Sequence, residues 1–339
     1  MIRRNIRYQS GFTLLELVLV IFILGILLMA SMTFIEGEDA QLRYQRSLEK
    51  LDQTISAIID VRDYQNQPLL SGFVYDNGIL PPIPGGMPVD EFELRPLVSQ
   101  NTSWSGSGQN SWLNYAAYAP HYTGGEAPSS LITFTLEDSF KMFKGYRGSY
   151  LPPSELDSSD QFRDDWSVLF DVNIPTINQY DITFSHLLSD GTTPKFIDFT
   201  TSISRTIKAD DWSVVLSQLN FSVSNETSTV FPATNETAFA AVMVFENSAA
   251  DEVMARWRTY AFEINISIAP GTTETFTGAA VSWKNNGVIL DAAAASAIRI
   301  PVGEHLFALI SESTESVIDA SPELLVPRSS IPIISLTAK

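Results

Sequence analysis

One long apolar stretch near the N-terminus constrains this chain more than any other feature. Residues 12–35 are almost continuously apolar, and a helix of roughly 20 such residues can cross a lipid bilayer. A secretory signal would have a shorter apolar core that ends in small residues, so we expect this segment to be retained. Arginines precede it and acidic residues follow it, which predicts a cytoplasmic N-terminus and export of everything downstream. These residues are Arg3, Arg4, Arg7, Glu36, Glu38 and Asp39.

A single carboxylate interrupts the apolar stretch. Glu16 lies near its beginning, where an ionised side chain costs on the order of 3 kcal/mol. Two interpretations are open at this point: the side chain reaches the lipid headgroups, or it pairs with a positive charge inside the membrane.

The residues around Glu16 favour the second interpretation. The string Gly-Phe-Thr-Leu-Leu-Glu-Leu-Val at residues 11–18 closely resembles the processing site of type IV prepilins and pseudopilins. The resemblance implies that a prepilin peptidase removes the leader, residues 1–11, by cutting after Gly11 and then methylates Phe12. It also implies that Glu16 neutralises the terminal amine of a neighbouring subunit during assembly. Opposite charges in a low-dielectric environment attract strongly and would favour one axial register between subunits.

An amphipathic pattern follows the apolar segment. Apolar side chains recur at spacings of four and three residues, which places them on one side of a helix; they are Tyr44, Leu48, Leu51, Ile55 and Ile58. The pattern predicts that the membrane or filament-core helix of residues 12–35 continues as an amphipathic helix through residues 36–67, with Pro68 as its stop.

The remaining chain predicts an α+β protein. We expect the long helix to pack on an antiparallel β-sheet head at residues 68–180, followed by an additional β-rich, sandwich-like exported domain at residues 181–339. The evidence for that domain is a series of short β-rich runs separated by Ser, Thr, Asn, Gly and Pro. The runs are residues 196–204, 214–223, 239–245, 256–268, 272–283 and 298–310.

Two strings in the head, at residues 143–152 and 164–170, resemble the signature of pseudopilins related to the major pseudopilin of type II secretion. Asp165 and Trp166 fit that signature best. Ser167 and Val168 stand where the family has glycine and asparagine, which leaves open whether the tight turn is kept.

Some heads of this kind hold a structural calcium ion in the same region. Asp157, Asp160, Asp164 and Asp165 would supply carboxylate oxygens, the ligands that calcium prefers. Their spacing matches no EF-hand loop, and a solvated acidic loop is the favoured interpretation. No other cofactor is predicted.

Composition and motifs exclude several functional classes. The formal net charge of -18 disfavours nonspecific nucleic-acid binding, and the absence of cysteine excludes disulfides and thiolate metal sites. The histidines at 121, 186 and 305 lie in separate segments, and no hydrolase, P-loop or metalloprotease motif occurs. We therefore expect no enzyme.

The leading hypothesis is a structural subunit of a type IV pilus or a type II secretion pseudopilus. Because the exported part is larger than a usual repeating pilin head, we expect a low-copy minor or tip subunit that primes assembly. Its partners would be prepilin peptidase, other pilin or pseudopilin subunits and the inner-membrane assembly platform. It would reside in the bacterial inner membrane, with its C-terminal part in the periplasm, before it enters a filament or reaches the cell surface.

The alternative hypothesis is a membrane-anchored binding module. In this case the domain at residues 181–339 would act as an adhesin or cargo receptor, with exposed Trp212, Trp257 or Trp283 contacting the ligand. Tryptophans of this kind more often belong to a core.

Overall fold

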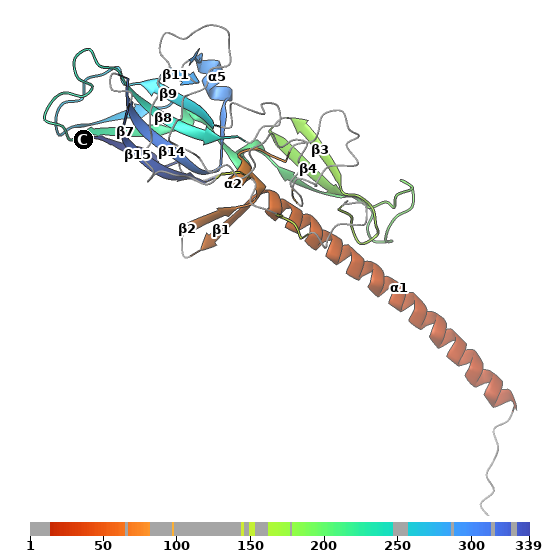
Figure 1. Ribbon diagram of the computed structural model, residues 1–339. Helices are drawn as coiled ribbons and strands as arrows, with labels where there is room; N and C mark the ends of the chain where they lie inside the picture. The colour runs from red at the N-terminus through yellow and green to blue at the C-terminus, as the bar shows by residue number, and fades with distance from the viewer. Residues whose placement is uncertain are drawn as a thin grey trace, which may run out of the picture.

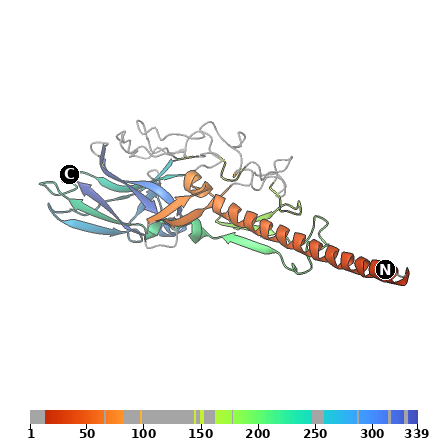
Figure 2. The same cartoon turned by 90° about the horizontal axis from the view of Figure 1, so that it is seen from below.

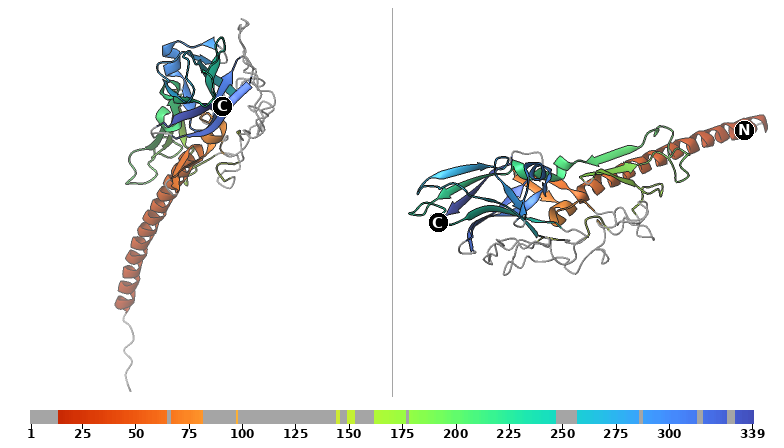
Figure 3. Two further views of the ribbon diagram at one scale, coloured as in Figure 1. Left: turned by 90° about the vertical axis from the view of Figure 1, so that its left-hand side faces the viewer. Right: turned by 90° about the horizontal axis from the view of Figure 1, so that it is seen from above.

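The computed structural model describes residues 14–64, 67–81, 97, 144–145, 149–152, 162–176, 178–246, 257–285, 288–312, 316–326 and 331–339, with backbone alone at 30–37, 62–64, 67–69, 174–176 and 257. Helix α1 (Leu14–Ile58) extends away from a body of β-strands (Figure 1). The N-terminal end of α1 and the C-terminus lie at opposite ends of the molecule (Figures 2 and 3). The predicted α+β class is confirmed.

The second half of α1 is held by the predicted apolar stripe. Leu51 and Ile58 of the stripe are buried, and Tyr44, Leu48 and Ile55 are partly buried against the same core. Spacings of three and four residues align side chains on one face of a helix. The helix therefore packs on the body as its sequence predicts.

The predicted extension of the helix through residues 36–67 is wrong at its C-terminal end. The Ile59 N–H donates to the Ile55 carbonyl at 2.9 Å, after which strands β1 (Asp60–Tyr64) and β2 (Gln67–Ser71) form an antiparallel pair. The positions that would continue the apolar stripe, 62, 65 and 66, are Arg, Gln and Asn. A longer helix would bury nothing there, whereas pairing satisfies the backbone groups of both strands.

A three-stranded antiparallel sheet lies beside α1. Its strands, in spatial order, are β3 (Asp171–Thr176), β4 (Gln179–Phe184) and β5 (Ile203–Ile207). The buried residues of β4 join the core that covers the α1 stripe: Tyr180, Ile182 and Phe184. The short helix α2 (Phe73–Asn77) completes this core with Phe73 and Val74.

The strand predicted at residues 196–204 is a loop over most of its length. The Phe199 N–H bonds the Phe196 carbonyl at 3.0 Å, which closes a turn. Phe199 is buried whereas Ile197 is 85% exposed. The loop inserts one aromatic ring beside Tyr44, with ring centroids 4.9 Å apart, and β5 begins only at Ile203.

The C-terminal region forms the predicted sandwich. A six-stranded sheet of order β12-β11-β9-β8-β14-β15 faces a three-stranded sheet of order β10-β7-β16, and a short pair, β13-β6, flanks them. Strand bounds are β6 (Ser213–Val215), β7 (Asn220–Asn225), β8 (Ala238–Phe245), β9 (Trp257–Glu263), β10 (Thr273–Thr277), β11 (Trp283–Asn285), β12 (Val288–Ile289), β13 (Arg299–Pro301), β14 (Gly303–Ser311), β15 (Ser316–Leu325) and β16 (Ile333–Ala338). Short helices α4 (Ala209–Trp212), η5 (Leu216–Gln218) and α5 (Ala292–Ala297) connect strands.

Aromatic rings fill the space between the two sheets. Phe221 of β7 lies 5.1 Å from Phe262 and 5.8 Å from Phe307 between ring centroids, which are edge-on contacts. Aromatic pairs in this geometry are worth about 1 kcal/mol beyond the area they bury. Strand β16 runs parallel to β7 and contributes Ile334 and Leu336 to the same core.

The helical part and the sandwich meet where α2 ends. Gly78 has φ 67°, and a Cβ built there would lie 1.9 Å from the Phe245 carbonyl oxygen, so only glycine fits this contact. Beside it, the Lys144 ammonium donates to the Tyr75 carbonyl at 3.1 Å. His305 of β14 is buried nearby, with Nε2 2.7 Å from the Pro301 carbonyl oxygen.

His305 makes the stability of this junction depend on pH. Burial, aided by the Lys144 charge, lowers the pKa of His305 from 6.5 to about 3. As pH falls below about 6.5, the unfolded chain binds a proton that the folded protein does not, so folding stability decreases.

Glutamine keeps a donor for the Pro301 carbonyl but has no proton to gain in this pH range. We therefore expect His305→Gln to lose about 2 kcal/mol less folding stability than the wild type between about pH 6 and pH 4. Urea unfolding across this pH range measures it, since contributions from carboxylates are common to both proteins. If folding stability fell equally with pH in the two proteins, the role given to His305 would be contradicted.

Candidate functional site

The first half of α1 presents apolar side chains to its surroundings. Every large apolar residue described between Leu14 and Met29 is exposed, from 45% at Val20 to 82% at Leu14. An apolar surface of this extent on a folded protein marks contact with other apolar groups. Glu16 lies in the first turn of this segment and is exposed.

The predicted processing residues, Gly11 and Phe12, lie outside the described residues. Among residues described with their side chains, which in α1 stop at Met29 and resume at Glu38, no helix is long and apolar enough to cross a membrane.

A charged loop, residues 163–168, joins the second half of α1 to the sheet. Asp165 lies against the helix, with Oδ1 3.1 Å from Lys50 Nζ and Oδ2 3.8 Å from Arg46 Nη1. Its backbone N–H donates to Ser47 Oγ at 3.0 Å, and Lys50 Nζ also lies 3.4 Å from the Arg163 carbonyl oxygen. The loop is therefore attached to one turn of α1 by both ionic and backbone contacts.

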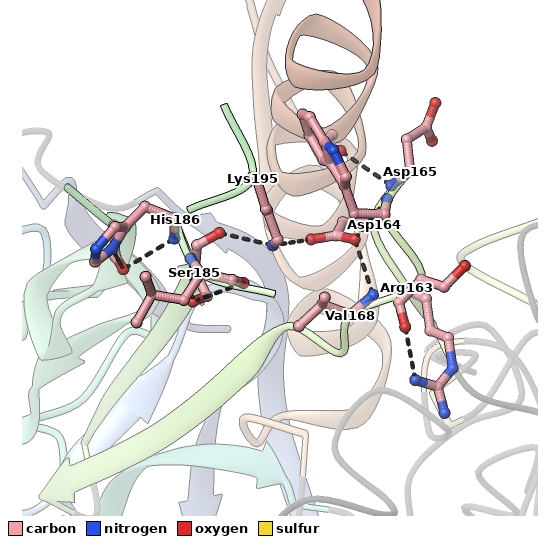
Figure 4. A network of polar contacts seen from close by, with 12 residues as sticks. Arg163, Asp164, Asp165, Val168, Ser185, His186 and Lys195 are labelled. Atoms are coloured by element: carbon pink, nitrogen blue, oxygen red, sulfur yellow. Dashed lines mark hydrogen bonds and ion pairs between the residues drawn. The ribbon is translucent and has the colours of Figure 1, made fainter. Parts of the chain in front are cut away.

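The neighbouring carboxylate, Asp164, binds its own turn and a lysine from another loop. Asp164 Oδ1 accepts from the N–H groups of Trp166 and Val168, each at 2.9 Å. Its Oδ2 pairs with the Lys195 ammonium, which also donates to the Ser185 carbonyl at 2.6 Å (Figure 4). Both side chains of this ion pair are almost completely buried. Burial lowers the pKa of Lys195, and the Asp164 carboxylate opposes that shift.

The chain makes a tight turn after Trp166, with serine at position 167. Ser167 has φ 62°, the left-handed conformation in which glycine is usual. Its N–H donates to the Asp164 carbonyl at 3.0 Å, and its carbonyl accepts from Arg163 Nη1 at 2.9 Å. Serine thus occupies a backbone conformation that costs about 1 kcal/mol or more for a residue with a Cβ.

The candidate metal ligands are not brought together in the part of the chain that the structure describes. Asp157 and Asp160 lie outside it, while Asp164 and Asp165 bind cationic side chains. No three His, Cys, Asp or Glu side chains gather there in a way that could hold a metal ion.

The tryptophans of the binding-module hypothesis belong to the core where they are described. Trp283 is fully buried and Trp212 is 7% exposed. Trp283 Nε1 donates to the Gly278 carbonyl at 2.8 Å, and Trp212 Nε1 donates to the Asn178 carbonyl at 3.1 Å. The favoured interpretation, that these tryptophans belong to a core, is confirmed for these two, which are not exposed as the alternative hypothesis requires. The side chain of Trp257 lies outside the described residues.

Sequence reasoning missed the cations that bind the two carboxylates of the charged loop. Arg46 and Lys50 are one helical turn apart on the polar side of α1, a spacing that could have suggested one shared partner. Lys195 carries no comparable signal, because it lies 31 residues from Asp164 and is brought to it by the loop after β4.

Comparison with known families identifies the N-terminal segment. Residues 6–32 match the model of a family described as the prokaryotic N-terminal methylation motif. The chain carries a type IV prepilin-type signal. This signal confirms the resemblance inferred from residues 11–18 and indicates processing by prepilin peptidase and assembly with other pilin subunits. No curated protein and no solved structure matches the chain.

The conformation of Ser167 predicts a stabilising substitution. Ser167→Gly should raise the free energy of unfolding by about 1 kcal/mol, because it removes the Cβ that opposes positive φ. Ser167→Val should lower it by at least as much, since a branched Cβ is least compatible with this conformation. Urea denaturation of the full chain measures both changes.

Ser189→Gly is the matched control. Ser189 is another exposed turn serine but has no positive φ, so glycine there should lower stability by about 0.5 kcal/mol. An equal change in the free energy of unfolding for Ser167→Gly and Ser189→Gly would contradict the proposed role of the Ser167 conformation.

Proposed function

We propose that this prepilin-type protein is a low-copy subunit of a type IV pilus or a type II secretion pseudopilus. It would be held in the inner membrane as a single-pass protein by the apolar half of α1, with its body in the periplasm. After removal of residues 1–11, the same helix would enter the filament core. The role is structural rather than catalytic.

The observation that carries this proposal is the methylation motif on an exposed apolar helix. The motif covers residues 6–32, and the described apolar side chains that follow Phe12 are exposed up to Met29. Lipid before assembly, and neighbouring helices after it, would cover the same surface. One segment thereby serves both states without refolding.

The position of the sandwich supports a place at the filament tip. It lies beyond the C-terminal end of α1, on the side away from the apolar half (Figures 1 and 3). In a filament whose helices stack along its axis, this sandwich would occupy space that the next subunit needs. A terminal subunit has no such neighbour, so the bulky domain is accommodated there. A filament built wholly of this protein would refute the low-copy role.

Processing is tested by the intact mass of the protein extracted from membranes. We expect loss of residues 1–11 and a gain of one methyl group in cells that contain prepilin peptidase, and the full-length mass in cells that lack it. An unprocessed N-terminus in both strains would contradict the pilin pathway and leave a simple anchored domain.

The Glu16 carboxylate is expected to direct assembly. Glu16→Gln keeps the size of the side chain but removes its charge, and loss of one partner of a buried ion pair costs about 3 kcal/mol or more. We expect at least about a tenfold decrease in the protein recovered with sheared filaments, while its amount in the membrane is unchanged. Glu49→Gln, an exposed glutamate on the same helix, is the control. Equal recovery of the two variants would contradict this role.

A further inference from the structure

A calcium ion near the Asp164 loop, the less favoured interpretation of its sequence, conflicts with the chemistry of the described donors. A calcium ion takes six to eight oxygen ligands, among them free carboxylates. Both oxygens of Asp164 are engaged, one by two backbone N–H groups and the other by the Lys195 ammonium. The oxygens of Asp165 face Lys50 and Arg46. A divalent ion between these two carboxylates would be repelled by the Lys195 ammonium on one side and by Lys50 and Arg46 on the other.

Lys195 already occupies the environment that a bound cation would use. Its ammonium contacts a carboxylate oxygen of Asp164 and the carbonyl oxygen of Ser185. It also lies 4.6 Å from the ring centroid of Phe184 and 5.8 Å from that of Trp166, distances at which an aromatic face attracts a cation. The backbone holds it there, since Lys195 N–H donates to the His186 carbonyl at 2.9 Å.

We propose that the Lys195 ammonium is the built-in cation of this loop, and that the loop folds without a divalent ion. The amine neutralises the buried Asp164, whose Oδ1 fixes the turn at Trp166 and Val168. A lysine side chain thus neutralises the Asp164 carboxylate in place of a metal ion. The attachment of the loop to α1 is then independent of the calcium concentration outside the cell.

The test is thermal unfolding of the full chain in detergent. Addition of calcium chloride or of EDTA should shift the melting temperature of the wild type by less than about 1 °C. Lys195→Met should lower it by at least about 5 °C, because a buried carboxylate loses its counter-ion. The double variant Asp164→Asn with Lys195→Met should regain at least half of that loss, since neither charge remains.

Lys284→Met is the matched control. Lys284 also lies over an aromatic ring, 4.7 Å from the Phe239 centroid, and pairs with Glu263, but this glutamate is 49% exposed. Its removal should shift the melting temperature by no more than about 2 °C.

Two results would overturn the proposal. One is a wild type that loses about 5 °C or more in EDTA and regains it with calcium; the other is a Lys195→Met protein as stable as the wild type. If Lys195→Met does not accumulate in folded form, native mass spectrometry of the wild type decides. A bound calcium ion overturns the proposal, and a metal-free mass supports it.

Discussion

The burial of one side of α1 against β4, β5 and α2 is the interaction on which the rest of the described structure depends. It places a sheet and a loop beside a helix whose other half, from Leu14 to Met29, remains exposed. Because an α-helix satisfies its own backbone hydrogen bonds, it can pass from a folded body into an apolar medium without a break. The packed half therefore determines the direction in which the exposed half leaves the body.

Apolar burial and polar contacts both act between α1 and the body, but only the polar contacts fix the position along the helix. Burial brings the surfaces together and is nearly non-directional, so it would tolerate sliding along the helix. The contacts of Asp165 with Lys50 and of its N–H with Ser47 are directional and hold the loop at one helical turn. Asp164 then extends this attachment to Lys195 and the loop after β4. Two adjacent residues thus connect the helix, the turn and the sheet.

Local patterns in the sequence predicted much of this fold; one failure came from a local signal, and the others occurred where distant residues decide. The stripe from Tyr44 to Ile58 and the β-rich run at 239–245 are periodic or continuous signals, and both became the expected elements. Pro68 predicts too late an end for α1, because the apolar stripe itself ends at Ile58. At residues 196–204 alternation was misleading, since Phe199 is drawn to Tyr44, more than 150 positions earlier. The partner of Asp164 could not be predicted, because only the folded loop brings Lys195 to it.

The parallel pairing of β16 with β7 has a consequence for the order in which the chain can fold. Residues 220–225 and 333–338 lie side by side, so the three-stranded sheet lacks an edge strand, and the core lacks Ile334 and Leu336, until β16 arrives. If the chain is exported with its N-terminal helix first, as proposed, this strand crosses the membrane after the other described strands. Contacts between such distant residues form slowly, because a long loop must close first. The sandwich is then completed only after translocation, and until that point its aromatic core stays accessible to periplasmic chaperones and proteases.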